Sequence, residues 1–319
     1  MNKVPMRDGY GKALLELCEN RKDVMVLDAD VAMSTRTVWI RDKYPEHFID
    51  MGISEQDMVG TASGLALSGM TPFVSTYCVF LAGRAWDQIR TTVCYNNLNV
   101  KFGGAHAGIS VGPDGATHQA LEDIALTRVL PNMTVIVPCD AEETRKATLA
   151  MAKVNGPCFC RFGREAVPMV TDENTPFEIG KARMVQEGSD VSVFAVGPMV
   201  YEAMEAAKQL KEEGISAEII DLHTIKPMDT EAVVASVKKT RCCVTAEEHQ
   251  MYGGLFGVVA ECLAWNDPVP MEAVAVADSF GESGEPGELM KKYGLSAENI
   301  IAKVKTVIRR KKNESSSCH

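Results

Sequence analysis

Residues 51–69, MGISEQDMVGTASGLALSG, place one glutamate at the start of an otherwise apolar helix. The preceding residues 47–51 are typical of a short buried strand, Gly52 turns the chain, and Ser54 is a helix-capping residue type. Glu55 can simply stabilise the helix dipole here. The helix is rich in small residues, however, which indicates packing against another backbone. A carboxylate in such a packing interface, from which water is excluded, is a candidate for proton transfer.

A second group of side chains that could take part in catalysis or binding lies in a loop after a predicted strand at 100–103. His106, Asp114 and His118 frame the sequence GISVGPDGAT, whose glycines and proline favour a loop. A loop histidine is often only a surface residue. Two histidines that bracket an aspartate can also hydrogen-bond the hydroxyls of a sugar and carry its protons, because imidazole titrates near neutrality. As a zinc site the set lacks a further His or Cys nearby, so we predict no metal site in this chain.

Aromatic residues follow the predicted strand at 72–76. Tyr77 and Phe80 are three residues apart, which fits one face of a helix, so they can be ordinary core residues. They can also present flat faces to a bound ring. The sequence pattern leaves both interpretations open.

The hydrophobic pattern that must position these residues is that of an α/β protein. Short β-branched runs alternate with helical patterns, which indicates βαβ units and parallel sheets. The first half is predicted to form strands at 24–27, 48–51, 72–76, 100–103, 134–137 and 158–161, and helices at 9–19, 55–68, 84–95 and 141–153. The second half is predicted to form strands at 191–196, 217–221, 242–247 and 271–275, and helices at 199–213, 230–238, 254–265 and 297–310.

The chain is long enough for two domains, each with its own core. Residues 167–188 are rich in Pro, Thr and Glu with weak periodicity, which is typical of a linker. We therefore predict two three-layer α/β/α domains, at 1–166 and 189–319, joined by a linker at 167–188.

The amino-acid composition limits the classes of binding partner that fit this chain. A net charge of −10, from 33 basic and 43 acidic residues, argues against nucleic acid or an acidic membrane as the main partner. No stretch reaches the roughly 20 apolar residues that span a bilayer, and the first residues contain no apolar signal core. The ten cysteines show no CxxC pair, which indicates reduced thiols and a cytoplasmic protein.

Three motifs in order resemble a known family. GISEQDMVGTASGLALSG followed by PFVSTYCVFLAGRAWDQIR is similar to the pyrimidine-binding domain of thiamine-diphosphate enzymes. HAGISVGPDGATHQALEDIALTRVLPNMTVIVPCDAEE narrows this to the transketolase and deoxyxylulose-phosphate synthase group. The resemblance covers residues 7–307 but only the C-terminal half of a full transketolase. It implies a pyrimidine-binding domain followed by a transketolase C-terminal domain, with thiamine diphosphate as cofactor.

The resemblance also implies roles for single residues. Glu55 corresponds to the glutamate that activates the pyrimidine ring, Phe80 to the phenylalanine that stacks on it, and Tyr77 lies beside them. His106 and His118 correspond to catalytic residues that bind substrate hydroxyls. The residues implied to contact the substrate are Arg7, Asp30, Ser34, Asp114 and Arg164, with Arg164, Arg7 and Ser34 at the positions of phosphate ligands. Relative to the synthases, the alignment shifts by one residue at Gly83. Whether Arg84 belongs to the site is therefore left open.

The chain lacks the GDG…N segment with which transketolases hold Mg²⁺ and the cofactor diphosphate. The resemblance therefore implies a split transketolase, in which a separate N-terminal subunit holds Mg²⁺ and the pair transfers a two-carbon ketol unit between phosphorylated sugars. The small-residue helix at 55–68 is expected to pack against a second copy of this chain.

Other activities remain open at this point. A deoxyxylulose-phosphate synthase-like carboligase, or a transketolase for an unusual pentose phosphate, fits the same motifs. A 2-oxoacid dehydrogenase beta subunit shares the glutamate motif but neither the histidine loop nor Arg164. A non-catalytic assembly partner is disfavoured because Glu55, Phe80 and both histidines are present together. The sequence does not identify the sugars.

Overall fold

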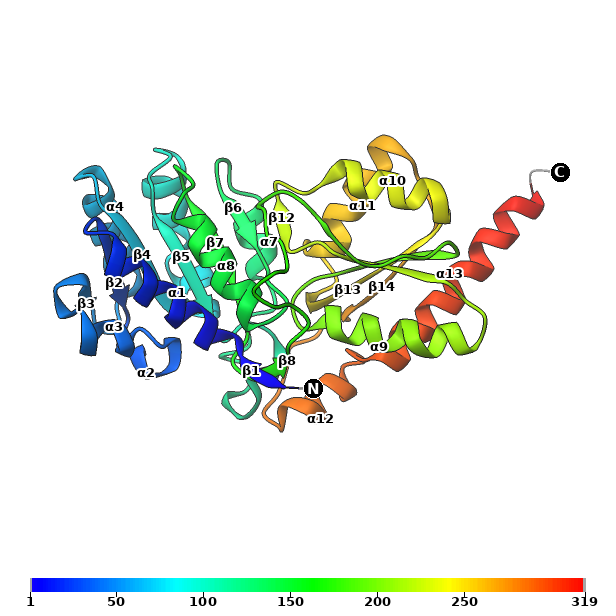
Figure 1. The fold of residues 1–319 in the computed structure, drawn as a ribbon, viewed down its shortest axis with the longest axis horizontal. Helices are drawn as coiled ribbons and strands as arrows, with labels where there is room; N and C mark the ends of the chain where they lie inside the picture. The colour runs from blue at the N-terminus through cyan, green and yellow to red at the C-terminus, as the bar shows by residue number, and fades with distance from the viewer. Residues whose placement is uncertain (1, 318–319) are drawn as a thin grey trace.

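The computed structural model describes residues 2–317, with the backbone alone for residues 314–317. Two α/β units lie side by side, each built on its own sheet (Figure 1). A short antiparallel ribbon of β1 (Lys3–Pro5) and β8 (Ala166–Pro168) lies where they meet. The prediction of an α/β fold with parallel sheets is confirmed.

The first sheet has the strand order β12-β6-β7-β5-β4-β2-β3. All neighbours are parallel except β12, which is contributed by the second half of the chain and pairs antiparallel with β6. The strands are β2 (Val24–Asp28), β3 (Phe48–Asp50), β4 (Thr71–Tyr77), β5 (Lys101–Ala105), β6 (Thr134–Ile136), β7 (Cys158–Arg161) and β12 (Thr224–Lys226).

The helical segments of the first unit lie between these strands. They are α1 (Met6–Asn20), α2 (Ala32–Thr35), α3 (Val38–Lys43), α4 (Glu55–Leu67), α5 (Cys78–Arg84), α6 (Trp86–Gln88), α7 (Asp123–Arg128) and α8 (Ala141–Met151), with the 3₁₀ turns η1 (Pro45–His47) and η3 (Ile109–Asp114) and the π-helical turn η2 (Ile89–Cys94). Helices α1 and α8 pack together over one core, whereas α4, α5 and α7 belong to the core on the opposite face.

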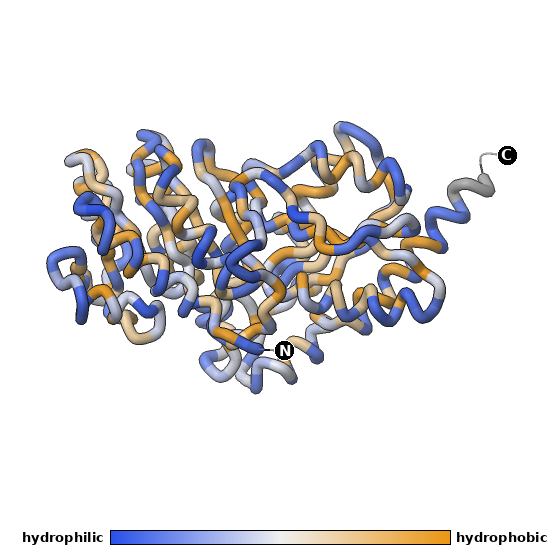
Figure 2. The backbone as a smooth tube through the Cα atoms, viewed as in Figure 1, coloured by the Kyte–Doolittle hydropathy of each residue, from blue (hydrophilic) through white to orange (hydrophobic). Residues whose placement is uncertain are grey.

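The second sheet has the order β14-β13-β10-β11-β9, parallel except for β9. Its strands are β9 (Arg183–Gln186), β10 (Val191–Ala195), β11 (Ala217–Asp221), β13 (Cys243–Gln250) and β14 (Met271–Val276). Its helices are α9 (Met199–Glu212), α10 (Thr230–Thr240), α11 (Leu255–Asn266), α12 (Pro286–Lys292) and α13 (Ala297–Ser317). The strands themselves are largely hydrophobic. Helix α9 alternates between hydrophobic and hydrophilic residues, as a half-buried helix must (Figure 2).

The structure departs from the predicted elements in several places, and it also contains β1, β12, α2, α3, α7 and α12, which the pattern did not predict. The helix predicted at 84–95 is in fact three pieces, because α5 already begins at Cys78, directly after β4, and ends at Arg84. The segment predicted as a linker, 167–188, contains the end of β8 and all of β9. Where one domain ends and the next begins stays a prediction. No helix within residues 2–317 combines the length and the apolar character that a bilayer crossing requires.

Candidate active site

The predicted site residues gather at the carboxyl edge of the first sheet, where ligands bind in parallel α/β sheets. Each of five neighbouring strands, β3, β2, β4, β5 and β7, is followed by at least one of them. Asp30 and Ser34 follow β2, Glu55 follows β3, Tyr77 and Phe80 stand at the end of β4, His106 directly follows β5, and Arg164 follows β7.

Glu55 is the first residue of α4, and its carboxylate is buried, with 2% of the residue exposed. The Ser54 side chain does not cap the helix as expected, because its Oγ donates to the carbonyl of Met51 at 2.7 Å. Arg84 instead compensates the charge: its Nη1 lies 3.0 Å from Oε2 and 3.2 Å from Oε1 of Glu55. The carboxylate therefore meets a cation that the sequence alone did not assign to the site.

Four rings form a continuous group beside this pair. Tyr77 and Phe80 have their ring centroids 6.1 Å apart in a stacked arrangement, and His106 lies 4.3 Å from Tyr77. The His118 ring meets Phe80 edge-on at 5.1 Å and Tyr77 at 6.0 Å. Tyr77, Phe80 and His118 are only half-buried, so their faces are available to a ligand. Tyr77 and Phe80 are thus not fully buried core residues, and their contact with a ligand stays a prediction.

His106 joins the rings to a cationic group. Arg7 places Nη1 3.5 Å from His106 Nε2 and 3.2 Å from the Ser34 carbonyl, while the Tyr77 hydroxyl donates to Ser34 Oγ at 3.0 Å. Burial, and next the charges of Arg7 and Arg164, lower the pKa of His106 to about 3. The imidazole is therefore neutral at physiological pH, contrary to the expectation that it titrates near neutrality. Its Nδ1 is buried without a hydrogen-bond partner among the described residues.

Arg164, after β7, and Asp114, at the end of η3, lie close to each other. Arg164 Nη1 donates to the Val111 carbonyl at 3.1 Å and lies 3.5 Å from Asp114 Oδ1. Burial, together with Arg36 and Arg164, lowers the pKa of the Arg7 guanidinium. The carboxylates of Asp8 and Glu165 partly offset the repulsion between these guanidinium groups, and the binding of an anion here stays a prediction.

Asp28 positions the loop that follows β2. It is fully buried and accepts hydrogen bonds from the Val31 amide and from the hydroxyls of Thr35 and Thr37, at 2.7 to 2.8 Å. Burial raises its pKa to about 6. Asp30, on the same loop, is exposed and has a φ of 61°. Asp28 therefore acts on the loop structure, whereas the role of Asp30 stays a prediction.

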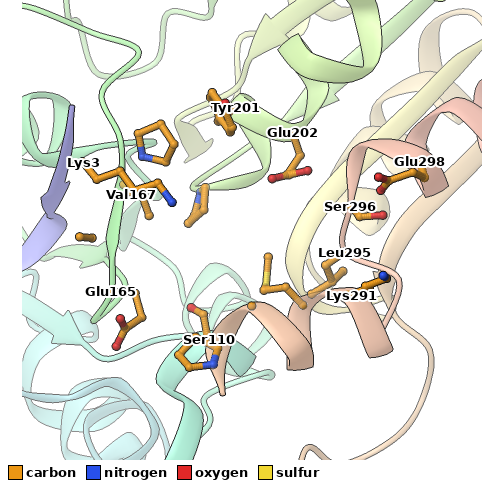
Figure 3. A pocket seen from close by; sticks show the side chains of 16 residues that line it. Lys3, Ser110, Glu165, Val167, Tyr201, Glu202, Lys291, Leu295, Ser296 and Glu298 are labelled. Carbon is orange, nitrogen blue, oxygen red and sulfur yellow. The ribbon is translucent and has the colours of Figure 1, made fainter. Parts of the chain in front are cut away.

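A separate cleft of about 530 Å³ lies between the β1–β8 ribbon and helices α9 and α12 (Figure 3). Side chains of mixed charge line it, among them Lys3, Glu165, Glu202, Lys291 and Glu298. None of the residues predicted for the active site lines this cleft. The predicted site residues thus lie at the sheet edge and outside this cleft.

One buried group of metal-capable side chains occurs among the described residues, at the carboxyl ends of β6 and β11. Cys139, Glu143 and Asp221 approach one another within 4.8 Å. Arg183 occupies the same place, with Nη2 2.8 Å from Asp221 and Nε 3.7 Å from Glu143. The guanidinium neutralises one carboxylate, and burial together with the Asp221 charge raises the pKa of Glu143 well above its usual range, so the group is a buried ion-pair network.

Arg84 is the site residue that sequence reasoning left open. The uncertain register at Gly83 hid it, and the aligned motif could not say which way the side chain turns. The available signal was spacing: Arg84 stands four residues after Phe80, on the same face of one helix. Its guanidinium carbon lies 4.2 Å from the Phe80 ring centroid.

Comparison with known proteins agrees with this geometry. The family model for the transketolase pyrimidine-binding domain matches residues 2–170, and that for the transketolase C-terminal domain matches residues 180–300. The putative transketolase C-terminal section of Methanocaldococcus jannaschii is 43% identical over 94% of this chain and 95% of its own length. The 6-deoxy-6-sulfo-D-fructose transketolase subunit SqwH of Clostridium sp. strain MSTE9 is 39% identical over 96% of this chain and 95% of its own.

A solved structure described as a split-gene transketolase, inactive beta4 tetramer, superposes with a TM-score of 0.90 at 46% identity, over 96% of this chain and 99% of that one. The carboxyl edge of the parallel sheet carries a buried carboxylate, aromatic faces and imidazoles. This arrangement is typical of an α/β enzyme that acts on small molecules. The chain belongs to the transketolase family and contains its pyrimidine-binding and C-terminal domains.

Proposed function

We propose that this chain is the C-terminal subunit of a two-component transketolase, which transfers a two-carbon ketol unit between sugar phosphates. The observation that carries the proposal is the single group formed by Glu55, the Tyr77–Phe80 pair and the two histidines at one sheet edge. A chain that only assembled with a catalytic partner would not need a buried carboxylate beside open aromatic faces.

The residues present fit thiamine diphosphate, the cofactor of the family. When bound, thiamine diphosphate supplies a carbanion that breaks and forms carbon–carbon bonds. Glu55 would hold a proton at the pyrimidine ring, and Phe80 and Tyr77 would support the face of that ring. Mg²⁺ and the diphosphate would be held mainly by the N-terminal subunit, because the metal-capable group of the described residues already pairs with Arg183.

The substrate proposed for the cationic end is a phosphorylated sugar. Arg7, Arg164 and the Ser34 loop would bind its phosphate, since bidentate guanidinium groups suit such an anion. His106, His118, Asp114 and Asp30 would contact the hydroxyls. Because His106 is neutral, it would act as a hydrogen-bond partner rather than as an acid. A sugar sulfonate is the second candidate, favoured by the name of the Clostridium relative.

Helix α4 offers a contact face for assembly. Gly60 and Gly64 are exposed, and no atom lies within 4 Å of a Cβ built at either position. Ile53 and Leu67 flank them with 74% and 75% of their surface exposed. A second copy of this chain is the proposed partner of this face, in addition to the N-terminal subunit. The buried, unpaired thiols accord with a cytoplasmic location.

The test is a labelling experiment with both subunits. The purified pair, with thiamine diphosphate and Mg²⁺, is given a ketose phosphate carrying ¹³C at C1 and C2 and an unlabelled aldose phosphate. Mass spectrometry is expected to find both labelled carbons in a ketose two carbons longer than the acceptor. Label that stays in the donor, across phosphorylated and sulfonated sugars, would contradict the proposal.

A further inference from the structure

Glu55 has an unusual electrostatic situation in the free subunit. Its carboxylate is buried at the start of α4, and the hydrogen bonds to both of its oxygens come from one nitrogen of Arg84. Burial of a carboxylate is costly without a charged partner. In the free subunit, the positive charge of Arg84 therefore offsets the free-energy cost of burying the Glu55 carboxylate.

The guanidinium of Arg84 makes two contacts at once. One edge donates to Glu55, and the guanidinium carbon lies 4.2 Å from the ring centroid of Phe80. A flat, hydrogen-bonding group on Phe80 with an edge toward Glu55 is also the description of a bound aminopyrimidine in the proposed function. Arg84 and the pyrimidine ring thus compete for the same carboxylate and the same aromatic face.

We propose that Arg84 is a placeholder for the pyrimidine ring of the cofactor: it occupies the seat between Glu55 and Phe80 in the free subunit and is displaced when thiamine diphosphate binds. The proposal rests on the proposed function, because it requires that the seat receives that ring. It makes Arg84 a positioning residue that acts through Glu55.

The surroundings of Arg84 allow this displacement. The Arg84 side chain is 48% exposed, whereas that of Glu55 is 2% exposed, so the arginine can leave toward solvent while the carboxylate stays. Arg84 is the last residue of the short helix α5, and the preceding Gly83 has nothing within 4 Å of a Cβ built on it.

The exchange has a defined energetic consequence. As long as Arg84 occupies the seat, only the fraction of subunits with an open seat can bind the cofactor, and the apparent dissociation constant rises by the inverse of that fraction. Once Arg84 has left, the buried carboxyl group lacks a cation. The ring nitrogen of the cofactor would then replace Arg84 as the hydrogen-bond partner of Glu55.

The experiment compares Arg84→Ala, Glu55→Gln and the double variant in the complex with the N-terminal subunit and Mg²⁺. Isothermal titration calorimetry with thiamine diphosphate gives the dissociation constants, and urea unfolding of the free subunit gives the coupling between the two residues. Arg41→Ala, which removes an exposed arginine paired with Asp42 on the same domain, is the matched control.

Arg84→Ala is expected to bind thiamine diphosphate about tenfold more tightly than the wild type, with the unfolding constant of the free subunit raised about tenfold. In the Glu55→Gln background the same change is expected to alter either quantity less than twofold, and Arg41→Ala to alter neither. Equal or weaker binding by Arg84→Ala in a complex whose wild type binds the cofactor would overturn the placeholder alone. A wild-type complex that binds no cofactor would overturn the proposed function with it.

Discussion

The buried, neutral state of His106 predicts a specific loss of stability in mild acid. The folded protein holds this imidazole with a pKa of about 3, whereas an exposed histidine in the unfolded chain has a pKa of about 6.5. Between these two values the unfolded chain binds one proton more than the folded protein. The unfolding free energy of the protein therefore contains a contribution that is fully present above pH 6.5. This contribution is lost as the pH falls below 6.5.

The size of this contribution follows from the window. At about 1.4 kcal/mol per pH unit, the 1.5 units between pH 6.5 and pH 5 amount to about 2 kcal/mol. Because His106 is only 2% exposed, solvent screening does not reduce this value much. The variant His106→Gln removes the titrating group, so its unfolding free energy should fall by about 2 kcal/mol less than that of the wild type between pH 7 and pH 5.

The assay is urea unfolding at fixed protein concentration, followed by circular dichroism, across this pH range. Arg7→Gln serves as a second variant: after burial, the charge of Arg7 is the next cause that lowers the pKa of His106, so its removal should shrink the difference without abolishing it. Parallel pH dependences of wild type and His106→Gln would refute the reasoning, because His106 would then titrate equally in both states.

Three further predictions concern the site and the assembly. Glu55→Gln should leave the subunit folded and reduce ketol transfer by the two-subunit complex on the order of a hundredfold, as measured by the initial rate at saturating cofactor. Arg164→Ala should raise KM for a phosphorylated ketose about ten- to a hundredfold, and hardly change KM for its unphosphorylated counterpart, since a charged hydrogen bond contributes roughly 1.5–3 kcal/mol. Gly64→Leu should dissociate the assembly in analytical ultracentrifugation without a loss of monomer stability, because nothing lies within 4 Å of the new Cβ and leucine favours a helix over glycine by about 0.5–1 kcal/mol; Lys211→Leu on α9 is the control.

The sequence pattern predicted the elements whose hydrophobic periodicity is complete. Strands β7 and β11 have their predicted bounds, and α4 begins at the predicted Glu55, because buried strands and amphipathic helices are encoded by their own residues. The pattern missed β9 and β12, which are antiparallel strands at sheet edges. Short edge strands are defined by the partner strand rather than by their own composition.

The same distinction holds for the site. The motifs identified Glu55, Tyr77, Phe80 and both histidines, and the structure brings these residues together at one sheet edge. The direction of a flexible side chain such as Arg84 depends on three-dimensional neighbours, and no spacing rule fixes it. The charge state of His106 likewise depends on burial and on Arg7, which is 99 residues away in the chain.

The two-component nature of the enzyme can be tested most directly by one rate measurement. The initial rate of ketol transfer is measured for this chain alone, for the N-terminal subunit alone and for mixtures of increasing ratio, all with thiamine diphosphate and Mg²⁺. The account predicts no transfer by either subunit alone and a rate that saturates when the two are equimolar. Transfer by this chain alone at the rate of the mixture would contradict it.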